Sequence, residues 1–524
     1  MHDESARGRA ARPSRSAKVV LSAATAGAVL LTSAACTGAG GGNSAGEDTT
    51  LTIAAAAGLG FDLADQQPGW FEQYLQPVYD SLFRISPDGE VGPNVATEWE
   101  YDDSLTALTI DIRTDIEFSD GESLDADAVK ANIEHTRTGA STTASQLQNV
   151  EDVEVVDADT VVLHLSAPDP SLLPNLGMTA GMLASPAAIE AGGLKTTPVG
   201  SGPYTLDTAG TTEGSQYTYV RNPDYWNPDD YPYDRFVIKV LTDNNAILNA
   251  LRTGQIDAGP LGSAKDSKTA SDAGLNVINY PNGDLEALYF YDKTGTTTPA
   301  LADVRVRQAI NYALDRDAIV KAGYGDLATP TMQMFSITRD DGIFDPALDE
   351  VYPYDPDKAR ELLAEAGYPD GFDVVMPDWS GYAPEVNAAI NQNLADVGIR
   401  VTPDTMPLEQ LYGNTLQGGY AMGWQPYEDN RPWDLIQFQL KPDAPWNPFH
   451  YEDPQVTELI SKIQAASGDE QTALFKELNR YLVETAWSAP INATVFNYAT
   501  SAEVVATPQA FAKRPPLYNF APAD

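Results

Sequence analysis

Segments with the periodicity of strands alternate with segments of helical periodicity along most of the chain. Residues 105–113 alternate apolar and polar side chains, with Leu108, Ile110 and Ile112 on one side, as in a half-buried strand. Asp125 is placed as the N-cap of an amphipathic helix. Further segments of both kinds are predicted: a strand pair at 153–165, strands at 236–241 and 399–402, and helices at 246–252, 304–313, 384–397 and 474–485. This alternation predicts an α/β protein with more than one lobe.

The composition limits the classes of function that the chain can have. It has 524 residues, enough for about two to four structural units, and 43% of them are hydrophobic. The 75 Asp and Glu residues outnumber 32 Lys and Arg, which gives a net charge of −43. Such a charge repels phosphates and argues against nucleic-acid binding as the main task. The single Cys excludes a disulfide framework, and four His leave little room for a metal cluster.

The N-terminus has the organisation of an export signal. Five basic residues in residues 1–18 precede an uncharged run of 14 small and apolar residues at 19–32, which is shorter than the roughly 20 that span a bilayer. The following residues 33–36 resemble a bacterial lipobox, with Ser33 at the position where Leu is usual. We therefore expect Cys36 to be acylated and to hold the protein on the outer face of the cell membrane. The alternative is an ordinary secretory cleavage site beside an incidental Cys.

No motif in the sequence identifies a catalytic reaction. The sequence contains no H-E-x-x-H motif, Walker loop or dinucleotide fingerprint, and its G-x-S-x-G string at 42–46 lies in a Gly- and Ser-rich tether. With so many carboxylates, any pair of them could pass for a glycosidase dyad. His135 and His164 fall on a predicted helix and strand, where a structural role is expected. The sequence predicts no catalytic residue, no metal site and no cofactor.

A series of short motifs, in order, resembles one family. They occur at residues 79–83, 87–89, 96–99, 108–113, 118–121, 199–204, 221–226, 251–257, 303–309, 354–356 and 362–368. Together they resemble the extracellular solute-binding proteins of peptide and nickel ABC importers, family 5. Most of these motifs have structural explanations, and Arg305 and Arg307, near a helix start, are expected to pair with nearby acids.

The resemblance implies a periplasmic-binding-protein type II fold, in which two α/β lobes are joined by two hinge crossings and one lobe has an inserted subdomain. The crossings are expected near residues 279–284 and 489–495. The implied parts are a lipoprotein signal peptide (1–35), a flexible tether (36–50), lobe I (51–92, 199–281 and 493–524), its inserted subdomain (93–198) and lobe II (282–492).

The ligand site is expected between the lobes. In the resembled peptide binders a Gly-Trp pair opens a loop whose Asp holds the ligand's α-ammonium; here Tyr427 stands at that position, so Glu428 or Asp429 is expected to take the role. A receptor for variable solutes also needs polar anchors and aromatic walls. The remaining candidates are Trp70, Phe71, Glu72, Gln73, Tyr289, Trp424, Gln425, Trp446 and Asn447.

These observations predict a non-catalytic, monomeric, lipid-anchored receptor that delivers short peptides to an ABC permease with its ATPase subunits. An oligosaccharide receptor is the alternative within the family, because Trp and Tyr side chains near a cleft can also stack on sugar rings. A secreted lipoprotein hydrolase is the alternative from another class. A sensory or adhesive surface protein stays possible, since binding lobes can signal without transport.

Overall fold

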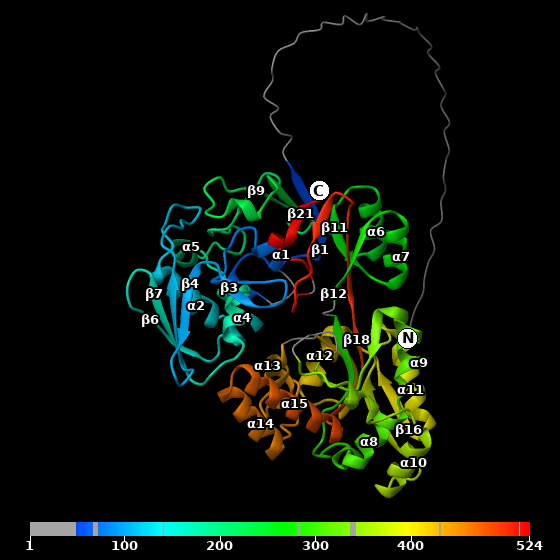
Figure 1. Ribbon diagram of the computed structural model, residues 1–524. Helices are drawn as coiled ribbons and strands as arrows, with labels where there is room; N and C mark the ends of the chain where they lie inside the picture. The colour runs from blue at the N-terminus through cyan, green and yellow to red at the C-terminus, as the bar shows by residue number, and fades with distance from the viewer. Residues whose placement is uncertain are drawn as a thin grey trace, which may run out of the picture. The chain divides into compact units, whose positions relative to one another are not determined.

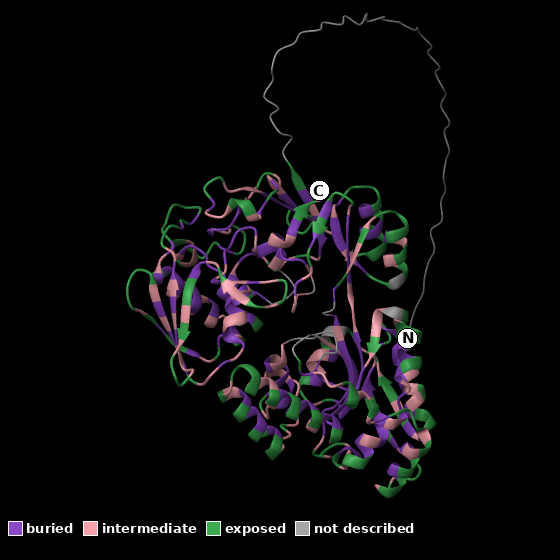
Figure 2. Ribbon diagram, viewed as in Figure 1, coloured by how far each residue is buried: buried purple, intermediate pink, exposed green. Residues whose placement is uncertain are grey.

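The computed structural model describes residues 49–66, 72–139, 141–280, 283–335, 342–428, 431–512 and 514–523. Three of the sheets within these ranges have four or more strands. Buried residues gather along these strands and on the inward faces of the helices (Figure 2). The fold is therefore described sheet by sheet.

The largest sheet has seven strands, in the order β12-β19-β11-β1-β10-β9-β8. Its strands are β1 (Thr50–Ala55), β8 (Tyr204–Leu206), β9 (Gln216–Arg221), β10 (Arg235–Val240), β11 (Ala258–Leu261), β12 (Asn276–Tyr280) and β19 (Phe496–Thr500). β1 runs parallel to both β10 and β11, although they are far apart in the sequence (Figure 1). The sheet is thus assembled from the beginning, middle and end of the described chain.

A second sheet has four antiparallel strands in the order β4-β5-β7-β6. Its strands are β4 (Ala96–Tyr101), β5 (Ala107–Ile112), β6 (Val150–Val155) and β7 (Thr160–Leu165). The side chains of β5 alternate between half-buried and buried, which confirms the strand predicted from the alternation at residues 105–113. The neighbouring helices are α2 (Ala126–Arg137), α3 (Thr142–Ser145), α4 (Leu172–Leu176) and α5 (Pro186–Ala191).

A third sheet has the order β14-β18-β13-β17 and is buried on both faces. Its strands are β13 (Asp284–Phe290), β14 (Ala328–Pro330), β17 (Met422–Glu428) and β18 (Ser488–Thr494). A parallel pair, β15 (Phe372–Pro377) and β16 (Ile399–Asp404), lies nearby. The helices of this region are α8 (Val304–Ala313), α9 (Arg316–Gly323), α10 (Pro356–Glu365), α11 (Pro384–Asp396), α12 (Leu408–Leu416), α13 (Pro432–Leu435), α14 (Pro454–Ala465) and α15 (Gly468–Glu484).

The chain passes twice between the seven-stranded sheet and the β13–β18 sheet. It leaves β12 at Tyr280 and enters β13 at Asp284, and it returns from β18 at Thr494 to β19 at Phe496. The first passage falls in the range 279–284 expected for a hinge crossing, and the second lies at the C-terminal end of the expected range 489–495. We call the region of the seven-stranded sheet lobe I and the region of the β13–β18 sheet lobe II.

Part of the acidic excess has a structural role at helix starts. The predicted N-cap Asp125 accepts a hydrogen bond from the backbone N–H of Ala128 at 3.0 Å. Asp side chains accept backbone N–H groups in the same way at the starts of α6 (Asn244–Arg252), α8, α9, α10 and α14. Each such cap stabilises its helix by about 1 kcal/mol.

Three of the motifs that carry the family resemblance meet at Asp80. This buried carboxylate accepts hydrogen bonds from Ser201 Oγ (2.9 Å), Tyr225 OH (2.9 Å) and Trp226 Nε1 (3.2 Å). Burial raises the pKa of Asp80 to about 6, against the opposing effect of these donors. A Cβ atom at Gly202 would lie 2.6 Å from the backbone carbon of Val78, so the close approach of these segments requires glycine. These motifs therefore hold lobe I together.

Candidate ligand-binding site

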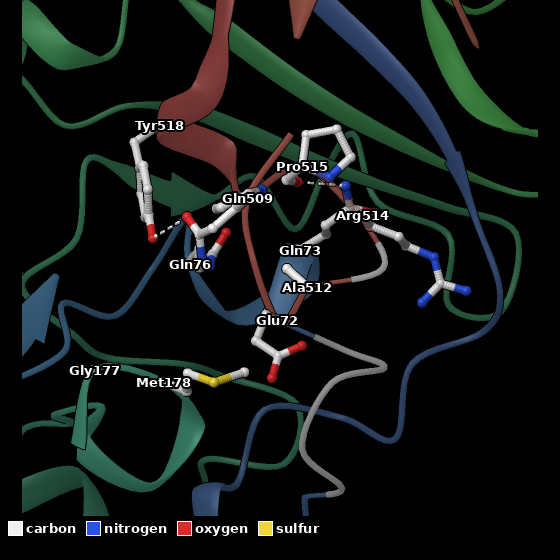
Figure 3. Close-up of a pocket in the computed structure, with 11 residues that line it drawn as sticks. Glu72, Gln73, Gln76, Gly177, Met178, Gln509, Ala512, Arg514, Pro515 and Tyr518 are labelled. Atoms are coloured by element: carbon white, nitrogen blue, oxygen red, sulfur yellow. Dashed lines mark hydrogen bonds between the residues drawn. The ribbon is translucent and has the colours of Figure 1, made fainter. Parts of the chain in front are cut away.

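A small pocket lies where α1 (Glu72–Leu75) meets a C-terminal segment of the chain (Figure 3). Its polar lining residues are Glu72, Gln73, Gln76, Gln509, Arg514 and Tyr518. Gly177, Met178, Ala512, Pro515 and Pro516 complete the wall. Its volume of about 30 Å³ suits a few waters or one ligand group, so a larger ligand would extend beyond it.

Glutamine side chains fix the two sides of this pocket to each other. Gln73 is 5% exposed and donates from Nε2 to the backbone carbonyl of Pro515 at 2.9 Å. Gln76 Oε1 accepts the backbone N–H of Leu517 at 2.8 Å. Gln509 Oε1 accepts the Tyr518 hydroxyl at 3.1 Å (Figure 3). Gln73 Oε1 is buried and has no hydrogen-bond partner among the described residues, so the pocket wall holds an acceptor for a ligand N–H.

Two opposite charges line the same pocket. Glu72 accepts the Thr179 hydroxyl at 3.1 Å, which fixes one carboxylate oxygen. The guanidinium carbon of Arg514 lies 5.9 Å from the ring centroid of Phe496. The pocket therefore offers one anionic and one cationic group at its wall, together with amide groups.

The strand β17 places its predicted ligand residues on opposite faces of a doubly buried sheet. Trp424 is 0% exposed and packs edge-on against Trp379, with 6.4 Å between ring centroids. Its neighbour Gln425 is 2% exposed and accepts the Tyr291 hydroxyl at 2.9 Å on the other face. Trp424 was expected as a ligand residue of the site, but in this structure its ring lies wholly inside the lobe II core.

The other predicted lobe II residues also have structural partners. Tyr289 is 6% exposed and stacks on Tyr291 with ring centroids 6.2 Å apart, and burial raises its pKa. Asn447 uses both amide protons on the carbonyls of Lys441 (3.0 Å) and Tyr451 (2.8 Å), so it braces its loop instead of offering a donor to a ligand. Trp446 is partly buried beside Tyr412, and Tyr427 is partly buried in the same core region.

Several predicted site residues lie outside the described residues. They are Trp70, Phe71, Asp429 and Cys36, and the side chain of Glu428 is likewise not described. Of the twelve ligand candidates, the structure brings Glu72 and Gln73 together in the pocket.

Sequence reasoning missed the C-terminal side of the pocket. Gln73 and Pro515 are separated by 442 positions, so no local pattern relates them. The one available signal was the adjacent basic pair of residues 513–514 in a strongly acidic chain.

Comparisons with known proteins agree with this architecture. Residues 90–453 match the family model described as bacterial extracellular solute-binding proteins, family 5. This match covers more than half of the chain. The chain belongs to family 5 of the bacterial extracellular solute-binding proteins.

One curated relative and two solved structures are similar to this chain. The glutathione-binding protein GsiB of Salmonella paratyphi A is 30% identical over 459 residues, which cover 81% of this chain and 85% of GsiB. The structure of Helicobacter pylori DppA with the peptide STSA is similar with a TM-score of 0.75 and 21% identity, over 91% of this chain and 99% of that one. AgaA of A. tumefaciens R10 with agropinic acid gives a TM-score of 0.76 and 23% identity, over 91% and 99% of the two chains.

Family membership defines the general activity. The chain has the type II periplasmic-binding-protein fold and is the substrate-binding receptor of an ABC importer, not an enzyme. Among the described residues, no helix has the length and apolar character needed to cross a membrane. Within the same ranges, no group of three or more His, Cys, Asp or Glu side chains is arranged to hold a metal ion.

Proposed function

We propose that this receptor captures short peptides between its two lobes and delivers them to a membrane permease, working as a monomer. The observation that carries the proposal is the lobe I pocket, which combines Glu72, Arg514 and the Gln73 Oε1 atom, for which the described residues supply no hydrogen-bond partner. A peptide carries a carboxylate and N–H donors, which Arg514 and the Gln73 Oε1 acceptor at the pocket wall complement. The similar protein GsiB is a glutathione-binding protein, and DppA binds the peptide STSA, which supports the same ligand class.

We assign the contact with the ligand's α-ammonium to lobe II, at the end of β17. An α-ammonium that enters a water-poor cleft needs a carboxylate partner, because burying an unpaired charge is very unfavourable. Glu428 ends β17 and Asp429 follows it, so either residue can supply this partner from lobe II. The residues Trp70 and Phe71, which directly precede Glu72, are proposed as apolar neighbours of the ligand on lobe I.

The oligosaccharide alternative has less support, because sugar rings need exposed aromatic faces. Trp424 is 0% exposed, and Trp379 and Trp433 are each 3% exposed, so these rings serve the lobe II cores. The peptide proposal does not require them.

Calorimetric titration with a peptide library and with an oligosaccharide set tests the ligand class. We expect the wild type to bind peptides. One of the two variants Glu428→Gln and Asp429→Asn should weaken this binding at least a hundredfold, since breaking a buried ion pair costs about 3–5 kcal/mol. Acetylating the peptide N-terminus should weaken wild-type binding similarly but add little in the sensitive variant. Binding of sugars but not of peptides would contradict the proposal. Mass spectrometry of ligand released from the purified protein provides an independent check.

The proposed attachment to the membrane depends on Cys36. Acyl chains stabilise membrane binding by about 0.8 kcal/mol per buried CH₂, so losing them should abolish stable attachment. We expect Cys36→Ser to release the protein into the medium, as measured by fractionation. A variant that stays fully membrane-bound would exclude this anchor.

A further inference from the structure

The region of the β4–β7 sheet contacts lobe II, although the chain does not connect the two directly. The strands β1 and β8, which precede and follow this region, belong to the seven-stranded sheet, so both of its connections lead to lobe I. Gln148 Nε2 donates to Gln437 Oε1 at 2.8 Å, and Gln464 Nε2 donates to the backbone carbonyl of Pro168 at 2.8 Å. Gln437 lies in the helical turn Ile436–Leu440 that follows α13, and Gln464 lies on α14.

On the side of the β4–β7 sheet, Asp169 holds the contact residues in place. This buried carboxylate accepts the amide Nδ2 of Asn149 at 2.8 Å and the backbone N–H of Ser171 at 3.0 Å. The two bonds tie the segment before α4 to the residue next to Gln148. The Gln148 amide and the Pro168 carbonyl are therefore presented to lobe II in fixed positions.

Charges across this contact both attract and repel. Burial raises the pKa of Asp169, and the positive charge of Lys441 in lobe II acts against this shift. Burial also raises the pKa of Asp434 on α13; the Arg431 charge and the Ser171 side chain oppose this shift, whereas the Asp169 charge adds to it. Lys441 therefore attracts Asp169 across the contact, and Asp434 repels it.

The same segment supplies one wall of the lobe I pocket. The helix α4 directly follows Ser171 and ends before Gly177 and Met178, which line the pocket. The Nη2 atom of Arg431, which precedes α13, lies 3.5 Å from the sulfur of Met178. Both ends of this five-residue helix thus lie beside the α13 segment of lobe II.

We propose that the contacts of Gln148 with Gln437 and of Pro168 with Gln464 form a latch that stabilises the closed form of the receptor before ligand binds. Opening about the two crossings must separate the latch, because its two sides are covalently joined through those crossings alone. A contact that exists in one form shifts the equilibrium toward that form, and a larger closed fraction raises the apparent affinity for any ligand that binds it. The inference depends on opening about the crossings and not on the class of ligand.

A crosslink measures the closed form without ligand. Gln148→Cys and Gln437→Cys are combined with Cys36→Ser, which removes the natural thiol of the chain. In protein verified to be ligand-free by mass spectrometry, we expect an ethane-linked bis-maleimide to join the two thiols within one molecule. The control pair of Gln148→Cys and Gln392→Cys should not react in this way, because Gln392 lies on α11, which Figure 1 shows on the opposite side of lobe II from α13. Failure of the first pair to crosslink would overturn the inference.

Variants then test whether the latch stabilises the closed form. In the first cysteine pair, Gln464→Ala removes the second hydrogen bond and should slow the crosslink about threefold to tenfold, the range for one hydrogen bond. The control Gln392→Ala loses an exposed hydrogen bond to Asp396 within α11 and should leave the rate unchanged. An unchanged rate in Gln464→Ala would show that the contact does not favour closure, which would overturn the inference.

The charges provide an independent test with two opposite signs. Lys441→Gln removes the attraction across the latch and should slow the crosslink, whereas Asp434→Asn removes the repulsion and should accelerate it. The rate at which each single thiol reacts with N-ethylmaleimide corrects for changes in its own reactivity. Changes of the same sign in both variants would contradict a latch in which Asp169 faces these two residues.

Discussion

Glu286 and Asn492 lie opposite one another on the neighbouring strands β13 and β18, and both residues are 0% exposed. One oxygen of Glu286 accepts the Tyr324 hydroxyl at 2.5 Å. Its Oε2 atom and both amide atoms of Asn492 have no hydrogen-bond partner among the described residues. The ladder is irregular directly after Glu286, so a strand defect and a buried carboxyl occur together near the first crossing.

The first prediction concerns the protonation of Glu286. Burial raises its pKa to about 8, and the neighbouring charge of Asp284 acts in the same direction, against the hydrogen bond from Tyr324. The unfolded value is about 4.3, so the stabilising contribution is fully present below that pH and is lost as the pH rises through about 8. Glu286→Gln stays neutral and should flatten the fall in unfolding free energy between pH 5 and pH 8.5. Equal pH slopes in urea titrations of both proteins would contradict this prediction.

A second prediction concerns Asp80, where three segments of lobe I meet. Asp80→Asn removes the charge and turns one of the two acceptor oxygens into an N–H donor, so at least one of the three hydrogen bonds must be lost or reversed. Hydrogen bonds to a charged group contribute about 1.5–3 kcal/mol, so we expect a loss of at least that size in the unfolding free energy. The control Asp88→Asn changes an exposed acid nearby and should stay within about 0.5 kcal/mol of the wild type. Urea denaturation measures both variants.

The third prediction concerns Trp424. Removing its buried indole leaves a cavity beside Trp379 and Leu288, and Trp→Ala changes in cores cost about 3–5 kcal/mol. Trp424→Ala should therefore lower the unfolding free energy by that amount, and peptide affinity should be retained once the variant is kept folded at low temperature. A large loss of affinity in a variant of unchanged stability would restore the ligand-wall interpretation.

Trp424 also illustrates what local patterns can and cannot predict. The sequence placed Trp424 at the start of a loop, but residues 422–428 form the strand β17, in which Trp424 and Gln425 point to opposite faces. No local pattern indicates that both faces of that sheet are buried, because this depends on helices distant in the sequence. The strand β5 was predicted correctly because its alternation reflects burial on one face alone.

Arg307 shows that the partners of a charged side chain are also hard to predict from local sequence. It was expected to pair with an acid, as Arg305 does with Asp303, yet it is buried and donates to the backbone carbonyls of Leu301 (2.8 Å) and Ala486 (3.1 Å). Sequence neighbours predicted the exposed pair, whereas the contact with Ala486 comes from the residues that follow α15, 179 positions away. The C-terminal side of the ligand pocket was missed for this reason, since its contacts with α1 depend on the complete fold.

The last prediction concerns the crossing at Gly283. A Cβ atom there would lie 2.2 Å from the backbone oxygen of Thr494 and 2.3 Å from its Oγ1, on the other crossing. Thr494 Oγ1 also accepts the backbone N–H of Asp284 at 2.6 Å, so the two crossings are in direct contact. Gly283→Ala must push them apart, and such overpacking costs about 1–3 kcal/mol. The control Gly381→Ala has open space around the added methyl and should behave as the wild type.

If the crossings act as a hinge, Gly283→Ala should also change how the receptor responds to ligand. Ligand shifts an equilibrium between open and closed forms only by its differential affinity for them. We expect small-angle scattering to show a smaller radius of gyration with saturating peptide in the wild type and in Gly381→Ala. In Gly283→Ala the decrease should be weaker, or should need more peptide, because the altered contact changes the relative stability of the two forms. A wild-type radius that peptide leaves unchanged would argue against closure, and a normal decrease in Gly283→Ala would show that contact with Thr494 does not control it.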